Sequence, residues 1–328
     1  MGAFDDLVGN RTLNARLATM ARTGKVPPSL LFTGPAGVGK LETATALAMA
    51  ENCLSGVGEA CRECAACTRI VKGEHPDVLT ALQQGKKGEA DAMRTIVRDI
   101  HSRPFEARRR VVILVDAERM HPTTANILLK TLEEPPEWAL LILVTSNAAF
   151  LLPTIRSRCQ IYRFAPLAAE DVKQLLTTKH GMDDERATLL SALSVGSLTR
   201  ALELEDESLA EVRDEAFRAA SVVSTSLPDS KLVPWAESLA RNDQLLLFLQ
   251  LLIGICRDVA SSHSGGTFVH RDRMDEIERL RDGAPLSGWI EAHSLAESTL
   301  TDVRDRYLNK RISMGHLLNR LNRIAVPS

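Results

Sequence analysis

Apolar residues in the first half of the chain form short runs, separated by segments with helical spacing. The runs lie at residues 29–35, 77–82, 111–115, 139–147 and 160–164. Their length and apolar content predict buried strands. The segments 41–54 and 123–136 carry helical spacing, and Pro135 and Pro136 end the second one. Strands that alternate with helices predict an α/β fold, with a parallel sheet covered on both faces.

Short apolar runs that would predict strands are not found after about residue 165. From there to residue 328 the apolar residues recur with helical periodicity. Residues 184–205 predict two short helices joined at Gly196 and Ser197. We therefore expect three parts. They are an α/β domain at residues 1–165, a small helical domain at 166–206 and a larger helical domain at 207–328.

Composition narrows the class of protein. The chain has 328 residues, of which 45% are apolar and 25% charged, as in soluble globular proteins. With a net charge of −2, the protein has no overall positive potential that would bind nucleic acid. No export-signal pattern is apparent in the first residues, and the longest apolar run, Leu245–Ile255, is short of the roughly 20 residues that span a bilayer. We expect a buried helix there, no membrane association and a cytoplasmic setting.

The segment from Gly34 to Ala44 reads GPAGVGKLETA and nearly completes a phosphate-binding loop. The pattern G-x-x-x-x-G-K-[ST] requires a hydroxyl after the lysine to bind Mg²⁺, and this chain has Leu41 there. A predicted strand precedes the loop and a predicted helix follows it, which is the context that the motif needs. Amides around Gly34, Gly37 and Gly39, with Lys40, could still hold the phosphates of ATP or ADP. Alternatively, the turn itself requires the glycines.

Four of the six cysteines lie within fifteen residues. They are Cys53, Cys61, Cys64 and Cys67, spaced C-x7-C-x2-C-x2-C. Thiolates at this spacing can converge on one tetrahedral ion, and four protein ligands leave no open position for catalysis. We predict a structural Zn²⁺ site at about residues 53–67. Cys159 and Cys256 are expected to be ordinary core residues.

The segment RPFEARRR, residues 103–110, brings four arginines together before a predicted strand. It could contact DNA phosphates or another protein, but a solvated turn is favoured. Aromatic residues make up only 4% of the chain, so a surface for stacking single-stranded bases is not evident. A DNA-binding protein built on the zinc module therefore has little support.

Taken together, the phosphate loop, the cysteine module and the segments NILLKTLEEPPEWALLILVTSN and LPTIRSRCQIYRF resemble the bacterial clamp-loader AAA+ family. By motif the resemblance covers about residues 1–205. It implies an AAA+ domain with an inserted zinc module at residues 1–165, a helical lid at 166–206 and a helical collar at 207–328. The implied partners are the gamma/tau and delta subunits of DNA polymerase III and, indirectly, the sliding clamp and primer-template DNA.

Three departures from the family pattern fall at positions for metal or hydrolysis. Active members have adjacent Asp-Glu after the third strand, whereas this chain reads Asp116-Ala117-Glu118, and we expect the displaced Glu118 to point to the other side. Leu41 replaces the hydroxyl, and Thr199 stands where the family has a nucleotide-sensing arginine. The resemblance therefore favours the delta-prime type of subunit, which does not hydrolyse ATP. The alternative is the ATP-hydrolysing gamma/tau type.

The motif Ser157-Arg158-Cys159 is intact. The resemblance implies that Arg158 enters the ATP site of a neighbouring subunit as an arginine finger. Such a guanidinium neutralises the charge that spreads over the γ-phosphoryl oxygens in the transition state. The alternative is a surface or salt-bridged arginine.

Overall fold

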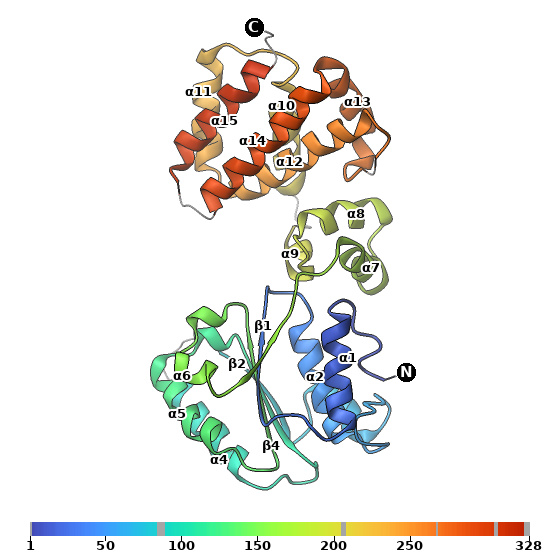
Figure 1. Cartoon of the computed structure of the whole chain (residues 1–328), viewed down its shortest axis with the longest axis vertical. Helices are drawn as coiled ribbons and strands as arrows, with labels where there is room; N and C mark the ends of the chain where they lie inside the picture. Colours follow the sequence, from blue (N-terminus) through green and yellow to red (C-terminus); the bar gives the residue numbers. More distant parts are fainter. Residues whose placement is uncertain (1, 84–88, 205–207, 267, 305–307, 325–328) are drawn as a thin grey trace. The chain divides into compact units, whose positions relative to one another are not determined.

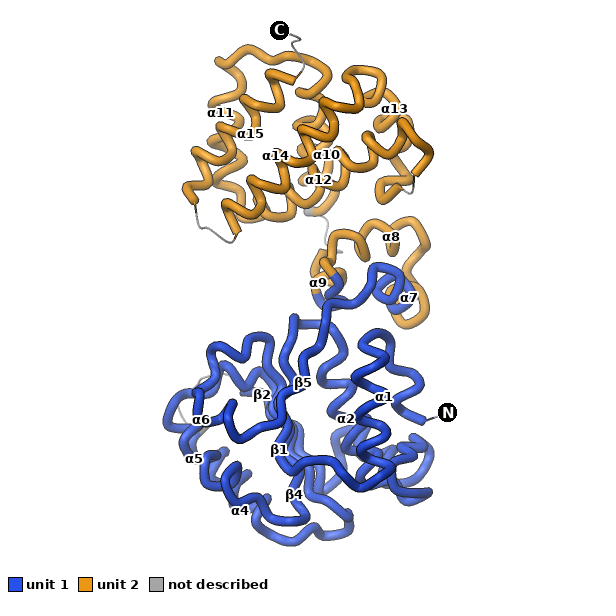
Figure 2. The backbone as a smooth tube through the Cα atoms, in the orientation of Figure 1, with its two compact units in different colours: residues 1–175, 196–199 blue, residues 176–195, 200–328 orange. Residues whose placement is uncertain are grey.

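The computed structural model describes residues 2–83, 89–204, 208–266, 268–304 and 308–324. These residues form two compact units (Figure 2). Unit 1 comprises residues 1–175 and 196–199, and unit 2 comprises residues 176–195 and 200–328. Because this division cuts through the proposed lid, the three-part division made from the sequence stays a prediction.

Unit 1 is built on one parallel sheet with the strand order β2-β3-β4-β1-β5. The strands are β1 (Ser29–Thr33), β2 (Val78–Leu82), β3 (Arg110–Val115), β4 (Ala139–Thr145) and β5 (Gln160–Arg163). All five predicted strands are confirmed within two residues at each end. Every residue of the central β4 is buried, because helices cover both faces of the sheet.

Figure 1 shows α1 and α2 on one face of the sheet and α4, α5 and α6 on the other. The helices and turns are α1 (Arg11–Arg22), α2 (Lys40–Asn52), α3 (Ala65–Lys72), α4 (Glu89–His101), η1 (Ala117–Arg119), α5 (Pro122–Glu133), η2 (Ala148–Phe150), α6 (Pro153–Arg156) and α7 (Ala169–His180). Met93, Ile100 and Leu128 pack a core against β3 and β4 on the α4–α5 side. The parallel sheet covered on both faces is therefore as predicted.

Unit 2 is helical throughout its described residues, as expected from the loss of strand signals. Its elements are α8 (Asp184–Leu193), α9 (Leu198–Glu203), α10 (Ser208–Ser221), α11 (Asp229–Arg241), α12 (Leu245–Ser262), η3 (Arg271–Arg273), α13 (Met274–Gly283), α14 (Leu286–Arg304) and α15 (Lys310–Ile324). Among the described helices, α12 alone is long and apolar enough to cross a membrane. It is packed against α10, α13 and α14 and buries most of its leucines, so the predicted buried helix is confirmed.

A buried hydrogen-bonded pair, Asp258 and His270, fixes α12 to the segment before η3. Asp258 and His270 are both fully buried. The Oδ2 atom of Asp258 accepts hydrogen bonds from the amides of Val269 and His270, each 2.8 Å long, and from His270 Nδ1 at 3.0 Å. The Nε2 atom of His270 has no hydrogen-bond partner among the described residues. Burial lowers the pKa of His270, although the bond to Asp258 opposes the shift.

We expect the free energy of unfolding to fall as the pH drops below about 6.5, the ordinary pKa of histidine. The unfolded chain binds a proton there that folded His270 resists, because a protonated Nε2 would be a buried donor without an acceptor. Arg213 on α10, whose charge also lowers this pKa, adds to the effect, whereas Asp272 opposes it.

Urea midpoints measured between about pH 5 and pH 8 test this prediction. His270→Gln should flatten the pH dependence, while His263→Gln, at an exposed position, should leave it intact. Equal slopes for wild type and His270→Gln would contradict the assignment.

Candidate functional site

The phosphate loop lies at the carboxyl edge of the sheet, between β1 and α2, as its motif requires. Lys40 opens α2 and is only 7% exposed. Its Nζ atom donates to the carbonyl oxygen of Gly34 at 2.6 Å and to that of Pro35. Burial lowers the pKa of Lys40, against the opposing charges of Glu118 and Asp116. These two bonds leave the third N–H donor of the Lys40 ammonium for a phosphate oxygen.

Two glycines of the loop are required by close contacts. Gly37 has φ 68°, and a Cβ there would lie 2.5 Å from the amide nitrogen of Thr199. A Cβ on Gly34 would lie 2.3 Å from the carbonyl oxygen of Phe164. The amide of Leu198 also donates to the Gly37 carbonyl at 3.0 Å. Residues 198 and 199, the part of α9 that belongs to unit 1, thus lie directly on the loop, and this close packing is by itself a sufficient reason for these glycines.

The segment after β3 corrects one expectation. Asp116 adopts a left-handed conformation with φ 53°, so the alternation of the strand ends and Glu118 stays at the carboxyl edge. The Oε1 atom of Glu118 accepts a hydrogen bond from the Ser146 amide at 3.0 Å and another from the Ser146 hydroxyl. Of the nearby carboxylates, Glu118 raises the pKa of Lys40 most.

Ala117 and Leu41 occupy positions where the family pattern has catalytic groups. Ala117 is fully buried in the core of unit 1, so no polar group reaches the loop from this position. Leu41 is 36% exposed, on the first turn of α2. Neither side chain can bind a metal ion or activate water.

The four clustered cysteines converge as predicted. Their Sγ atoms all lie within 4.8 Å of one another. Around a tetrahedral zinc with Zn–S bonds of about 2.3 Å, the sulfur atoms would be about 3.8 Å apart. Small side-chain adjustments close that difference, so the donor set can hold one Zn²⁺.

Backbone and hydroxyl donors in the cysteine module favour thiolates. The Ser55 hydroxyl and the Cys64 amide donate to Cys61 Sγ and lower the pKa of Cys61 to about 6. Burial opposes ionisation of Cys64, but the amides of Cys67 and Leu54 hold its pKa below the ordinary value. Burial raises the pKa of Cys67. A bound cation would offset that cost, because metal-bound thiols are deprotonated.

Cys159 and Cys256 lie in the two cores, as predicted. Cys159 is 8% exposed and belongs to the core of unit 1, and Cys256 is fully buried on α12. Burial raises the pKa of each thiol to about 12, so both are expected to be unreactive.

Arg158 lies in the turn between α6 and β5. The Ser157 hydroxyl donates to the carbonyl oxygen of Thr154 at 3.1 Å and fixes this turn. Arg158 donates from Nη1 to the same oxygen at 2.9 Å, and its Nη2 atom is 2.6 Å from Glu133 Oε1. Since β5 runs parallel to β1, Arg158 lies at the amino edge of the sheet and the phosphate loop at the carboxyl edge.

The arginine-rich segment before β3 is an exposed turn at its start, but its last three arginines make contacts within unit 1. Arg109 and Arg110 have side chains only 16% and 15% exposed. Arg109 pairs with Glu51 at 3.0 Å, and Arg110 pairs with Asp77 at 2.7 Å. Arg108 donates to the carbonyl oxygens at the end of α2. These three arginines make contacts within unit 1, whereas Arg103 is exposed, so the expected solvated turn holds for only part of the segment.

Three residues at the two edges of the sheet were not found from the sequence. Asn10 joins the loop to the end of β5, with bonds to the carbonyl oxygen of Val38 at 3.4 Å and to the Ala165 amide at 2.8 Å. Ser146 holds Glu118, and Glu133 pairs with Arg158. Each of these contacts joins segments distant in sequence, and no local pattern marks them.

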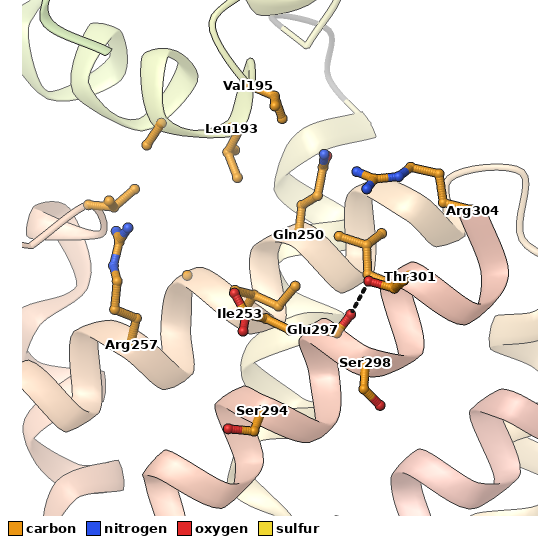
Figure 3. A pocket seen from close by; sticks show the side chains of 14 residues that line it. Leu193, Val195, Gln250, Ile253, Arg257, Ser294, Glu297, Ser298, Thr301 and Arg304 are labelled. Atoms are coloured by element: carbon orange, nitrogen blue, oxygen red, sulfur yellow. Dashed lines mark hydrogen bonds between the residues drawn. The ribbon is translucent and has the colours of Figure 1, made fainter. Parts of the chain in front are cut away.

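A cavity of about 620 Å³ lies in unit 2 between α8, α12 and α14. Figure 3 shows Arg257 and Arg304 at its two ends, with Gln250 and Ile253 between them. The dashed bond in that view joins Thr301 to the carbonyl oxygen of Glu297. None of the site residues predicted from the sequence lines this cavity.

Comparison with known proteins gives consistent matches. The family model described as "DNA polymerase III, delta subunit" matches residues 9–168. The DNA polymerase III subunit delta' of Bacillus subtilis is 28% identical over 76% of this chain and 77% of its own length. The gamma/tau subunit of Mycoplasma pneumoniae is 31% identical over 62% of this chain, which spans only 30% of that relative.

Among solved structures, the RuvB Holliday junction branch migration motor of Thermotoga maritima is similar over 64% of this chain, with 17% identity and a TM-score of 0.43. The family model and the two DNA polymerase III subunits agree with the motifs of unit 1. These matches, which the family model places at residues 9–168, support a member of the bacterial clamp-loader AAA+ family, to which the delta-prime and gamma/tau subunits of DNA polymerase III belong.

Proposed function

We propose that this chain is a delta-prime-type subunit of a cytoplasmic DNA polymerase III clamp loader. It hydrolyses no ATP itself and supplies Arg158 in trans to the ATP site of a neighbouring gamma/tau-type subunit. Its other partners are the delta subunit and, through the assembled loader, the sliding clamp and primer-template DNA. The module at Cys53, Cys61, Cys64 and Cys67 holds a structural Zn²⁺.

The observation that carries the proposal is the position of Arg158 relative to the chain's own phosphate loop. Arg158 precedes β5, whereas Phe164, which contacts Gly34 of the loop, follows it. The four residues of β5 span about 13 Å at roughly 3.3 Å per residue. An arginine side chain is shorter than that distance, so Arg158 cannot reach the phosphate loop of its own unit, which supports a role at a neighbouring site.

The chain's own loop supports the same reading. Leu41 offers no oxygen to Mg²⁺, and Ala117 offers no carboxylate to activate water. Thr199, at the position of the sensing arginine, packs against Gly37. The amides around Gly37 and Gly39, together with Lys40, bind ATP or ADP weakly in this proposal. The bound nucleotide is not hydrolysed there.

The alternative is an ATP-hydrolysing subunit of the gamma/tau type. One observation favours it. Glu118 lies at the same edge of the sheet as Lys40, and its negative charge raises the pKa of Lys40. In that case Glu118, rather than a residue at position 117, would activate the attacking water.

We expect the purified chain to show no steady ATP turnover, because both metal coordination and activation of water are missing. Adding it to a loader that lacks this subunit should restore hydrolysis by the neighbouring subunit. The measurement is phosphate release, with Lys40→Ala and Glu118→Gln variants beside the wild type. Turnover by the isolated chain that both variants abolish would establish the gamma/tau alternative.

A further inference from the structure

Arg158 is held by two acceptors at the amino edge of the sheet. One is the carbonyl oxygen of Thr154 in the same turn, at 2.9 Å from Nη1. The other is Glu133 Oε1, the last residue of α5, at 2.6 Å from Nη2. The side chains of Arg158 and Glu133 are 34% and 49% exposed, so the pair faces solvent. The guanidinium is thus fixed at the surface.

The two bonds leave most of the guanidinium available. Arginine carries five N–H donors: two on each terminal nitrogen and one on Nε. Arg158 uses one donor on each terminal nitrogen for Thr154 and Glu133, the partners it has among the described residues. Its three other donors can therefore reach a phosphate oxygen while both holding bonds persist.

Glu133 is itself fixed by its place on α5. Thr131 and Leu132, just before it, are buried, and the Thr131 hydroxyl is 3.2 Å from His101 Nε2 on α4. The amide of Glu134 donates to the carbonyl oxygen of Lys130 at 3.0 Å, and Pro135 then ends the helix. The packed end of α5 therefore fixes where the Glu133 backbone lies, and from there the carboxylate reaches Arg158.

We propose that Glu133 is the positioning residue for Arg158, fixing the plane and direction in which the guanidinium is offered to the neighbouring ATP site. This inference rests on the proposed function of Arg158. An unrestrained arginine samples many rotamers, and misplacement by about 1 Å can cost a catalytic group on the order of 100-fold in rate. The opposing effect is the negative charge of Glu133, which weakens the attraction of Arg158 for phosphate but is screened at this exposed position.

The experiment uses the assembled loader, with clamp and primed DNA, in which the other ATP sites carry lysine-to-alanine changes in their phosphate loops. We expect Glu133→Ala to lower kcat on the order of tenfold, with KM for ATP unchanged. Glu133→Gln keeps an oxygen acceptor and should lose only about two- to threefold. Glu134→Ala, on the adjacent exposed residue, is the matched control and should resemble wild type.

A double-mutant cycle separates positioning from a general structural effect. In the Arg158→Ala background, Glu133→Ala should cause no further loss, because it acts through Arg158. Melting temperature and assembly of the Glu133 variants should match wild type. The proposal is overturned if Glu133→Ala turns over ATP at the wild-type rate or faster, or if its loss persists without Arg158. If Arg158→Ala is itself silent, both this proposal and the proposed function are overturned.

Discussion

Replacing Arg158 by alanine will lower ATP hydrolysis at the neighbouring site while leaving this subunit folded and the loader assembled. An arginine finger contributes on the order of 10³–10⁵ in rate, equivalent to about 4–7 kcal/mol of barrier. Arg158 is suited to this role because its position at the amino edge of the sheet keeps it away from its own phosphate loop. The bulk rate of a loader with several ATP sites should fall much less than the rate at this one site.

Two variants make the Arg158 result specific. Arg158→Lys should rescue poorly, because an ammonium cannot provide the planar fork that binds two phosphate oxygens. Arg156→Ala is the matched control, because Arg156 ends α6 two residues before Arg158 and its buried Nε atom has no hydrogen-bond partner among the described residues. The measurements are ATPase and clamp-loading rates of the complete loader. If Arg158→Ala assembles and equals wild type in both, Arg158 is a structural residue and the proposed function is wrong.

Removing zinc should unfold the cysteine module locally. We expect one zinc ion per freshly purified chain, and none in a Cys64→Ser, Cys67→Ser double variant. Structural zinc in small peptides contributes about 10–16 kcal/mol at neutral pH, far more than the other contacts in this segment. Loss of the ion leaves the buried Cys67 thiol and its neighbours without the cation that offsets their deprotonation.

The effect of zinc removal should reach the end of α2. Arg108 donates to the carbonyl oxygens of Glu51 and Cys53, each at 2.9 Å, so the module and the helix end share one anchor. Hydrogen exchange should therefore accelerate at residues 50–67 after chelation, while β4 stays protected. Cys159→Ser should keep its zinc. A zinc content well below one per wild-type chain, or an unchanged content in the double variant, would disprove the site.

Local sequence patterns were sufficient for most of the fold. The five strands were predicted because buried parallel strands are short apolar runs, and the phosphate loop because its glycines fall between a strand and a helix. The cysteine spacing was also enough, since C-x2-C steps bring thiols together irrespective of the rest of the chain. Helix α4 was not predicted from the sequence, although Met93, Ile96 and Ile100 form its buried side.

The sequence by itself determined the class of sheet, the phosphate loop, the cysteine cluster and the helical second half. Each of these features has a local sequence pattern that is no longer than one strand or a few helical turns. Only the tertiary structure decided where Glu118 points, what Arg109 holds and which carboxylate meets Arg158. Glu118 and Ser146 are 28 residues apart, and Arg109 and Glu51 are 58 apart. Such pairs form because the parallel sheet and the helices packed on it bring distant segments together, and side-chain periodicity within one segment carries no information about that partner.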